Sequence, residues 1–212
     1  MNLLLVTLFM MNSFLVISLQ TPFKYITYNN IRPLYYELYY LEEDYNNKKI
    51  FDNKYSLEHV IPRSVYKDNN LIKRDMHNII LYPNKINNHR SNYKYVSDFK
   101  LYGNSILLDK FGNKIKYNKP LSEEDIYIKT NGRKTFMPAK KYRGYIARSA
   151  MYFLSTYPKY QDVILKDIID PYTLLTWHFE YPVNNLEKEK NYMINSIQGN
   201  NNIYVSEPSL LV

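Results

Sequence analysis

The sequence predicts an α+β fold, in which a single, mostly helical domain contains short strands between its helices. Three observations predict it. Apolar residues recur at helical spacing in several stretches, short apolar runs end at prolines, and a glycine-containing turn separates two further strand-like runs. The chain has 212 residues, of which 45% are hydrophobic, so it can bury a core and is not a disordered chain.

The first segment of the chain is unusually apolar. Residues 3–19 contain no charged side chain, and the first charged residue of the chain is Lys24. This length suits a signal peptide or a short anchor, although no basic start and no small-residue cleavage site accompany it. We expect residues 1–22 to be a signal peptide or anchor, with a buried first helix as the alternative, and residues 23–212 to form the domain. The protein would then be secreted or exported, and otherwise membrane-anchored or intracellular.

The expected elements follow from periodicity and from the positions of proline. A proline ends each of two short apolar runs, which reads as two strands, and proline or asparagine opens each of the last three helical patterns. In chain order we expect a helix at 31–45, strands at 57–62 and 79–81, a polar helix at 84–95, a hairpin at 101–117 with its turn at 111–114, and helices at 138–156, 171–179 and 184–198.

Charge and cysteine content limit the chemistry. The chain holds 28 Lys and Arg against 20 Asp and Glu and no cysteine. Within residues 60–150 the balance is 19 against 7, or +12, which favours a polyanionic partner because phosphate contacts release counterions; a merely soluble basic surface is the alternative. Without cysteine, thiol nucleophiles, iron–sulfur clusters and thiolate zinc sites are excluded, so a metal must be held by His, Asn, Asp or Glu.

Three clusters of polar residues are candidates for a site. His59 follows Glu58 in an apolar strand, where an unused charged pair would be costly to bury. Residues 75–95 gather histidine, asparagine, aspartate and arginine around one proline-ended apolar run. In the helix expected at 138–156, Arg148 lies among apolar residues and Gly144 permits close approach of another backbone.

These clusters carry a resemblance to a known family. Glu58 to Pro62 reads Glu-His-Val-Ile-Pro, Asp75 to Asn78 reads Asp-Met-His-Asn and is followed by Tyr82-Pro83, Asn88 to Tyr93 reads Asn-His-Arg-Ser-Asn-Tyr, and Arg143 to Arg148 reads Arg-Gly-Tyr-Ile-Ala-Arg. In this order the motifs resemble the endonuclease I family of DNA/RNA non-specific nucleases, in the His-Me finger (ββα-metal) superfamily. The sequence departs from the family pattern in the spacing from Asn78 to Pro83, at Lys190, where the family usually has arginine, and at Ile203-Tyr204.

The resemblance implies a small ββα-metal core and a metal-dependent, largely sequence-non-specific endonuclease that leaves 5′-phosphate and 3′-hydroxyl ends. His59 would be the general base, with one ring nitrogen fixed by a hydrogen bond to a backbone carbonyl and the other taking a proton from water. Glu58 and Asn78 would hold one Mg²⁺, with Mn²⁺ or Ca²⁺ as substitutes. The further expected site residues are Arg63 and Arg148 in catalysis and Arg90, Asn92, Arg143 and Lys85 in nucleic-acid binding.

The expected partner is DNA, with RNA as a second substrate, and the expected state is a monomer without a small-molecule cofactor. The alternatives are a catalytically inactive nucleic-acid-binding protein and a membrane-anchored protein, which requires that residues 1–22 are retained. Each of the arginines could instead form a structural ion pair. Moreover, Glu58 and His59 are adjacent on a strand and point to opposite faces, so they share a site only if the strand ends or twists there.

Overall fold

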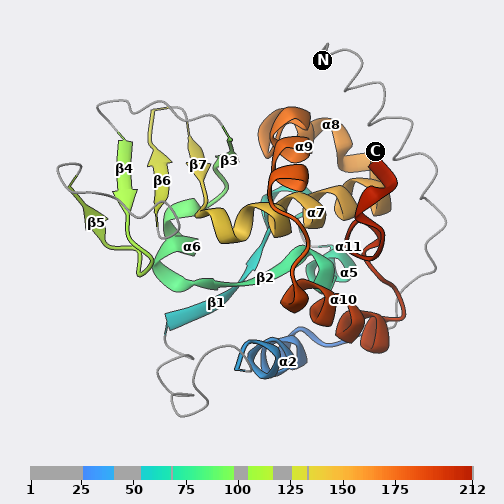
Figure 1. Cartoon of the computed structure of the whole chain (residues 1–212). Coiled ribbons are helices and arrows are strands. Elements are labelled where there is room, and N and C mark those ends of the chain that lie inside the picture. The colour runs from blue at the N-terminus through green and yellow to red at the C-terminus, as the bar shows by residue number, and fades with distance from the viewer. Residues whose placement is uncertain are drawn as a thin grey trace.

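The computed structural model confirms an α+β single domain that is mostly helical (Figure 1). It describes residues 26–40, 54–67, 69–97, 105–116, 126–132 and 134–211. The expected signal peptide or anchor at residues 1–22 and the end of the helix expected at 31–45 lie outside these ranges. Within them, no helix is both long enough and apolar enough to cross a membrane.

A strand pair followed directly by a helix forms the predicted ββα core. Strand β1 (Tyr55–His59) runs antiparallel to β2 (Ile79–Pro83), with Tyr55 opposite Pro83 and His59 opposite Ile79. Helix α6 (Asn84–Arg90) begins immediately after β2 and contacts both strands. This helix is shorter than the expected 84–95, because Ser91 takes a positive φ of 54° and ends it.

Three short elements connect the two strands of this core. They are α4 (Arg63–Tyr66), α5 (Asn70–Lys73) and the 3₁₀ turn η2 (Met76–Asn78). The Asn69 side chain accepts hydrogen bonds from the first backbone N–H groups of α5, and the Asp75 side chain does the same for η2. These caps satisfy backbone N–H groups that short helices leave without a partner. They hold the connection in a defined conformation, so that β2 begins beside β1.

A second sheet of five strands packs beside the core. Its order is β3-β7-β6-β4-β5, with β3 pairing parallel to β7 and the other pairs antiparallel. The strands β4 and β5 confirm the expected hairpin, with Gly112 at a φ of 77° in its turn, whereas β6 and β7 were not expected from the sequence. The strands are β3 (Lys94–Tyr95), β4 (Ser105–Leu108), β5 (Lys114–Ile115), β6 (Tyr127–Thr130) and β7 (Thr135–Met137).

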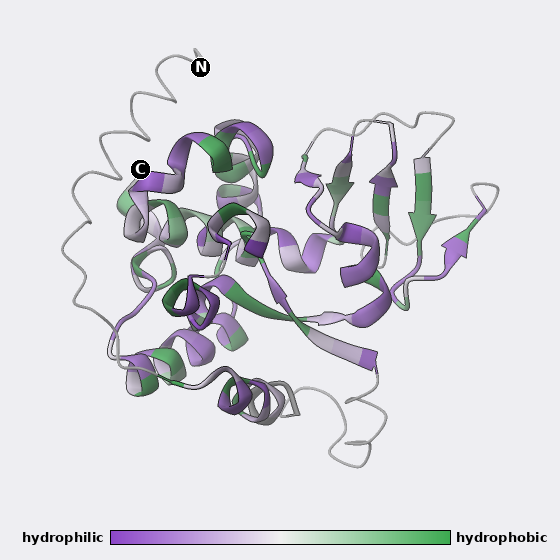
Figure 2. Cartoon of the chain, turned by 180° about the vertical axis from the view of Figure 1, so that it is seen from behind, coloured by the Kyte–Doolittle hydropathy of each residue, from purple (hydrophilic) through white to green (hydrophobic). Residues whose placement is uncertain are grey.

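Helix α7 (Lys140–Thr156) runs through the helical side of the domain and packs most extensively on α9. Every residue from Ile146 to Ser155 is buried, so this part of the helix is covered on all sides. The helices in Figure 2 carry both hydrophobic and hydrophilic residues, as helices around one core do. The remaining helices are α2 (Tyr28–Tyr40), η3 (Pro158–Tyr160), α8 (Gln161–Asp167), α9 (Pro171–Glu180), α10 (Asn185–Gln198), α11 (Ile203–Ser206) and η4 (Pro208–Leu211).

Two hydrophobic clusters hold the strand pair from opposite faces. The larger cluster includes Val60, Ile80 and Tyr82 together with α7 and the buried Trp177. The smaller one lies between α2, α10 and the strand pair and includes Ile79 and Leu81. Since successive residues of β2 enter different clusters and all five are buried, the strand has no solvent-exposed face.

Candidate active site

Glu58 and His59 lie at the end of β1 and point to opposite faces of it. The Glu58 carboxylate faces α6, where Arg90 Nη1 lies 2.7 Å from Oε1. The His59 ring faces α5 and α2, where it bonds the carbonyl of Lys73 and stacks on Tyr28 at 6.0 Å between ring centroids. Because β1 ends at His59, the two side chains can serve one substrate only around the end of the strand.

His59 is anchored through one ring nitrogen. Its Nε2 lies 3.0 Å from the backbone oxygen of Lys73, and since a carbonyl only accepts, Nε2 is assigned the proton and Nδ1 the free lone pair. Burial, opposed by the hydrogen bond to the Lys73 carbonyl and assisted by the charges of Arg63 and Lys73, lowers the pKa of His59 to about 4. The imidazole is therefore neutral at pH 7 with an unprotonated Nδ1, the state that a general base needs, and it is a weaker base than a free imidazole.

Arg90 holds the end of β1 in place. Its side chain donates to the Glu58 carboxylate, to the His59 carbonyl at 3.2 Å and to the Val60 carbonyl at 2.7 Å, and its guanidinium lies 4.5 Å from the centre of the Tyr95 ring. Only 1% of Arg90 is exposed. The expected contact of Arg90 with nucleic acid is therefore corrected: a desolvated guanidinium bound to protein oxygens positions Glu58 and is not available to a phosphate.

The structure also places Asn78 differently from the expectation. Asn78 is fully buried, its Oδ1 accepts from Ile61 N at 2.8 Å and its Nδ2 donates to Ile61 O at 3.1 Å. Both polar atoms of the amide are thus paired with the backbone that follows β1. Asn78 therefore links the two ends of the connection between β1 and β2 by hydrogen bonds. Because both of its polar atoms are used in this way, the geometry argues against a metal ion at this residue.

Asn87 is a site residue that sequence reasoning missed. It lies on α6 one turn before Arg90, so both face β1, and its Nδ2 donates to Ser56 Oγ at 3.0 Å. Ser56 and Glu58 alternate along β1 and share a face. Among the described residues the Asn87 amide oxygen has no hydrogen-bond partner, and the amide lies on the face of β1 that carries Glu58. The sequence signal that could have found Asn87 is its spacing of three residues from Arg90, which places both on one face of a helix.

Arg63 is the expected catalytic arginine that stays accessible. It is exposed at the start of α4, and its charge lies close enough to His59 to lower the pKa of that ring, after burial. Among the residues expected to bind nucleic acid, Asn92 and Lys85 are exposed. Arg143 is half-buried and donates to Pro138 O and to Tyr181 Oη, both at 3.0 Å.

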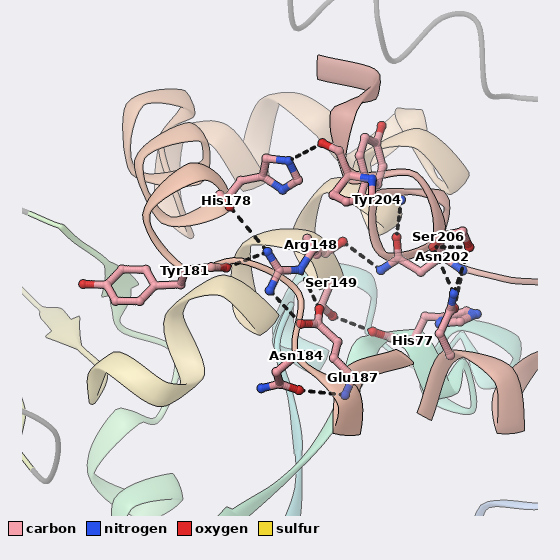
Figure 3. A network of polar contacts seen from close by, with 12 residues as sticks. His77, Arg148, Ser149, His178, Tyr181, Asn184, Glu187, Asn202, Tyr204 and Ser206 are labelled. Atoms are coloured by element: carbon pink, nitrogen blue, oxygen red, sulfur yellow. Dashed lines mark hydrogen bonds and ion pairs between the residues drawn. The ribbon is translucent and has the colours of Figure 1, made fainter. Parts of the chain in front are cut away.

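Arg148 forms a buried ion pair, which corrects its expected catalytic role (Figure 3). Its Nε and Nη2 each lie 2.6 Å from an oxygen of the Glu187 carboxylate, and Nη1 donates to the Tyr181 carbonyl at 2.8 Å. Arg148 is 1% exposed. A Cβ at Gly144 would lie 2.3 Å from the same Tyr181 carbonyl, so the glycine permits the close backbone approach that the sequence predicted.

A buried polar network joins η2 to the C-terminal helices. Tyr157 donates to the Asp75 carboxylate at 2.8 Å, Gln198 Oε1 accepts from Met76 N at 2.7 Å, and His77 Nε2 lies 3.2 Å from Asn200 O. Asp75, His77, Gln198 and Asn200 are buried, with at most 7% of each exposed, and Tyr157 is half-buried. The network fixes the turn from which β2 begins and so acts on the site through position alone.

Lys190, which stands where the resembled family has arginine, fits this scaffold. Its ammonium donates to Ile79 O at 2.6 Å and lies 4.6 Å and 4.0 Å from the centres of the Tyr35 and Tyr145 rings. Burial holds the pKa of Lys190 well below its usual value. Lysine in place of the family's usual arginine therefore affects the packing behind β2. It does not change the part of the site that is exposed to solvent.

Within the described residues, no cluster of three or more His, Cys, Asp and Glu is placed to hold a metal ion. Mg²⁺ does not require one, because it keeps several waters and is often bound through one or two protein oxygens. Glu58 and Asn87 supply such oxygens from neighbouring elements.

No curated protein matches the sequence. The family model for endonuclease I matches residues 12–209, nearly the whole chain. The chain therefore belongs to the endonuclease I family and is an endonuclease.

Proposed function

We propose that this endonuclease hydrolyses phosphodiester bonds in DNA, with RNA as a second substrate, and leaves 5′-phosphate and 3′-hydroxyl ends. The observation that carries the proposal is the state of His59. Its ring is fixed at Nε2 by the Lys73 carbonyl, and burial keeps it neutral with a free Nδ1. Because the exposed candidates Arg63 and Lys85 would contact phosphates and not base edges, little sequence preference is expected.

His59 would take the proton of the attacking water at Nδ1, while the water oxygen forms a bond to phosphorus and the bond to the 3′-oxygen breaks. The leaving 3′-oxygen would take a proton from solvent water and become the 3′-hydroxyl. The Lys73 carbonyl would stabilise the resulting imidazolium through Nε2–H. Tyr28, stacked on the ring within 9° of parallel, fixes its orientation and shields it from bulk water. Arg63 supplies an exposed positive charge on the same side for the phosphate.

The residues present fit one hard cation at Glu58 and Asn87. Both side chains offer oxygen, and burial raises the pKa of Glu58 to about 7 despite the opposing effect of Arg90, so a cation would favour its ionised form. The family is typically metal-dependent, and we propose Mg²⁺, with Mn²⁺ or Ca²⁺ as substitutes. When bound, the cation would stabilise negative charge on the phosphate and the leaving oxygen.

The test is nicking of supercoiled plasmid with Mg²⁺ and with EDTA. Replacing His59 by alanine should slow nicking by about 10²–10⁴-fold. His178→Ala is the matched control, because it also removes a buried imidazole bonded to a carbonyl, Pro208 O at 2.9 Å, and it should nick at nearly the wild-type rate. Retained cleavage in His59→Ala, or equal cleavage in EDTA, would exclude this mechanism; a single discrete cut site would exclude the lack of sequence preference.

The metal assignment is tested by comparing Asn87→Ala with Asn78→Ala. We expect Asn87→Ala to raise the Mg²⁺ concentration needed for half-maximal nicking by at least about 10-fold. Asn78→Ala should instead lower thermal stability, because it leaves Ile61 N and O unpaired. The opposite pattern would return the metal to Asn78.

We further propose that the protein is exported through residues 1–22 and acts as a monomer. Intact-mass measurement of protein from its native source tests whether this segment is removed. Light scattering of the purified protein tests the monomer.

A further inference from the structure

An aromatic side chain is presented on the rigid turn between β4 and β5. Phe111 is 54% exposed. Asp109 fixes the turn, since its carboxylate accepts from Phe111 N at 2.9 Å, from Asn113 N at 2.8 Å and from Asn113 Nδ2 at 3.1 Å. These bonds lower the pKa of Asp109 although partial burial opposes them. The ring is thus held in the solvent by an ordered turn.

The same turn is docked on the first residues of α6. Lys85 Nζ donates to Asn113 Oδ1 at 2.9 Å, and a Cβ at Gly112 would lie 2.5 Å from the Cβ of Lys85. Arg90, which holds Glu58, follows Lys85 by five residues, or about 8 Å along the helix. The turn is thus docked on the same helix that holds Glu58 at the proposed site.

Positive charges surround the exposed ring. Lys54 Nζ and Lys110 Nζ lie 5.9 Å and 5.5 Å from its centre, and both lysines are exposed. The positive field continues over α6, where Lys129 and Lys114 add to burial in lowering the pKa of His89. A single aromatic face framed by cations matches a strand that offers bases and phosphates alternately.

We propose that this turn binds single-stranded nucleic acid, with Phe111 stacked on an unpaired base and Lys54, Lys85 and Lys110 on the flanking phosphates. The inference rests on the proposed function for the class of ligand and adds a preference for unpaired strands. A base in a duplex offers its edges and not its face, so Phe111 can stack only where a base is unpaired. An apolar protein partner would require more than one exposed hydrophobic residue at this turn, and within the described hairpin Phe111 is the only large one.

The test is equilibrium binding in EDTA of a fluorescent oligothymidine of about 15 nucleotides and of a duplex of the same length. Phe111→Ala should weaken single-strand binding by about 5- to 100-fold and duplex binding by less than about 2-fold, whereas Phe111→Trp should retain both. Phe179→Ala is the matched control, since this phenylalanine is 53% exposed on α9 and should bind as wild type. Thermal unfolding should be the same for all variants.

The lysines are tested by the salt dependence of the same binding. The triple substitution of Lys54, Lys85 and Lys110 by alanine should reduce the slope of log K against log salt by about 2, from about 0.7 per phosphate contact. Equal weakening of single strands and duplexes by Phe111→Ala, or no weakening, would overturn the inference. If Phe111→Ala gives either of these results and the wild-type protein still nicks plasmid, the proposed nuclease function holds and the single-strand site does not. If the wild-type protein neither nicks plasmid nor binds the oligonucleotides, both proposals are wrong.

Discussion

Removing Arg148 should unfold the protein more easily without slowing its chemistry. The pair with Glu187 is almost completely buried, with side-chain exposures of 2% and 4%, and Arg148→Met leaves the carboxylate of Glu187 in the core without its cation. Breaking such a pair costs about 3–5 kcal/mol, a large share of a total stability of about 5–15 kcal/mol. With a urea dependence of about 2–3 kcal/mol per molar, the unfolding midpoint should fall by about 1–2 M.

The fluorescence of Trp177 reports this transition, because it is the single tryptophan of the chain and is fully buried. Nicking should be measured on the same samples, well below the unfolding midpoint, and should stay within about 2-fold of wild type per folded molecule. The double variant Arg148→Met, Glu187→Leu removes both charges and should recover at least half of the lost stability. A loss of nicking of about 100-fold or more with an unchanged urea midpoint would refute the structural role and return Arg148 to the catalytic site.

Three further predictions concern the helix contact and the histidines. Gly144→Ala places a Cβ against the Tyr181 carbonyl and should cost about 1–3 kcal/mol of unfolding free energy, measured as a lower urea midpoint; an unchanged midpoint would mean that α7 shifts freely. Burial lowers the pKa of His77 to about 3. The stability that the neutral ring contributes is therefore complete above pH 6.5 and is lost as the pH falls toward 3. In His77→Phe the free energy of unfolding should fall less steeply over this pH range, by up to about 1.4 kcal/mol per pH unit. For His59, whose pKa is about 4, nicking at saturating metal should persist below pH 6, and an inflection at 6.5 would contradict a buried base.

The sequence could predict the elements whose ends are set by local chemistry. The helix expected at 171–179 is α9, which begins at Pro171 with the Asp170 side chain as its cap. The helix expected at 184–198 is α10, for which Asn184 accepts from Glu187 N. Proline and capping side chains act within one turn of the chain, so their effect can be read without knowing the fold.

The strands β6 and β7 could not be predicted, because their stability comes from pairing with distant segments. They have four and three residues, and each is paired on both sides in the sheet. Likewise the pairing of Asn78 with Ile61 spans 17 positions of the chain. A sequence pattern shows that an asparagine is available at both 78 and 87, but only the packing of α6 across β1 shows which of them has an oxygen beside Glu58.

The arginines show why the formal charge of a sequence segment is larger than the positive charge that its surface offers to a polyanion. Arg90 and Arg148 belong to the segment 60–150, whereas their partners Glu58 and Glu187 lie outside it. Their pairing leaves +10 of the +12 in that segment, and it removes two of the arginines that could bind phosphate bidentately. The remaining cations around the site, Arg63, Lys54, Lys85 and Lys110, are exposed. Since lysines bind phosphate as point charges without fixed geometry, this surface is suited to holding a strand in many registers, which agrees with the proposed lack of sequence preference.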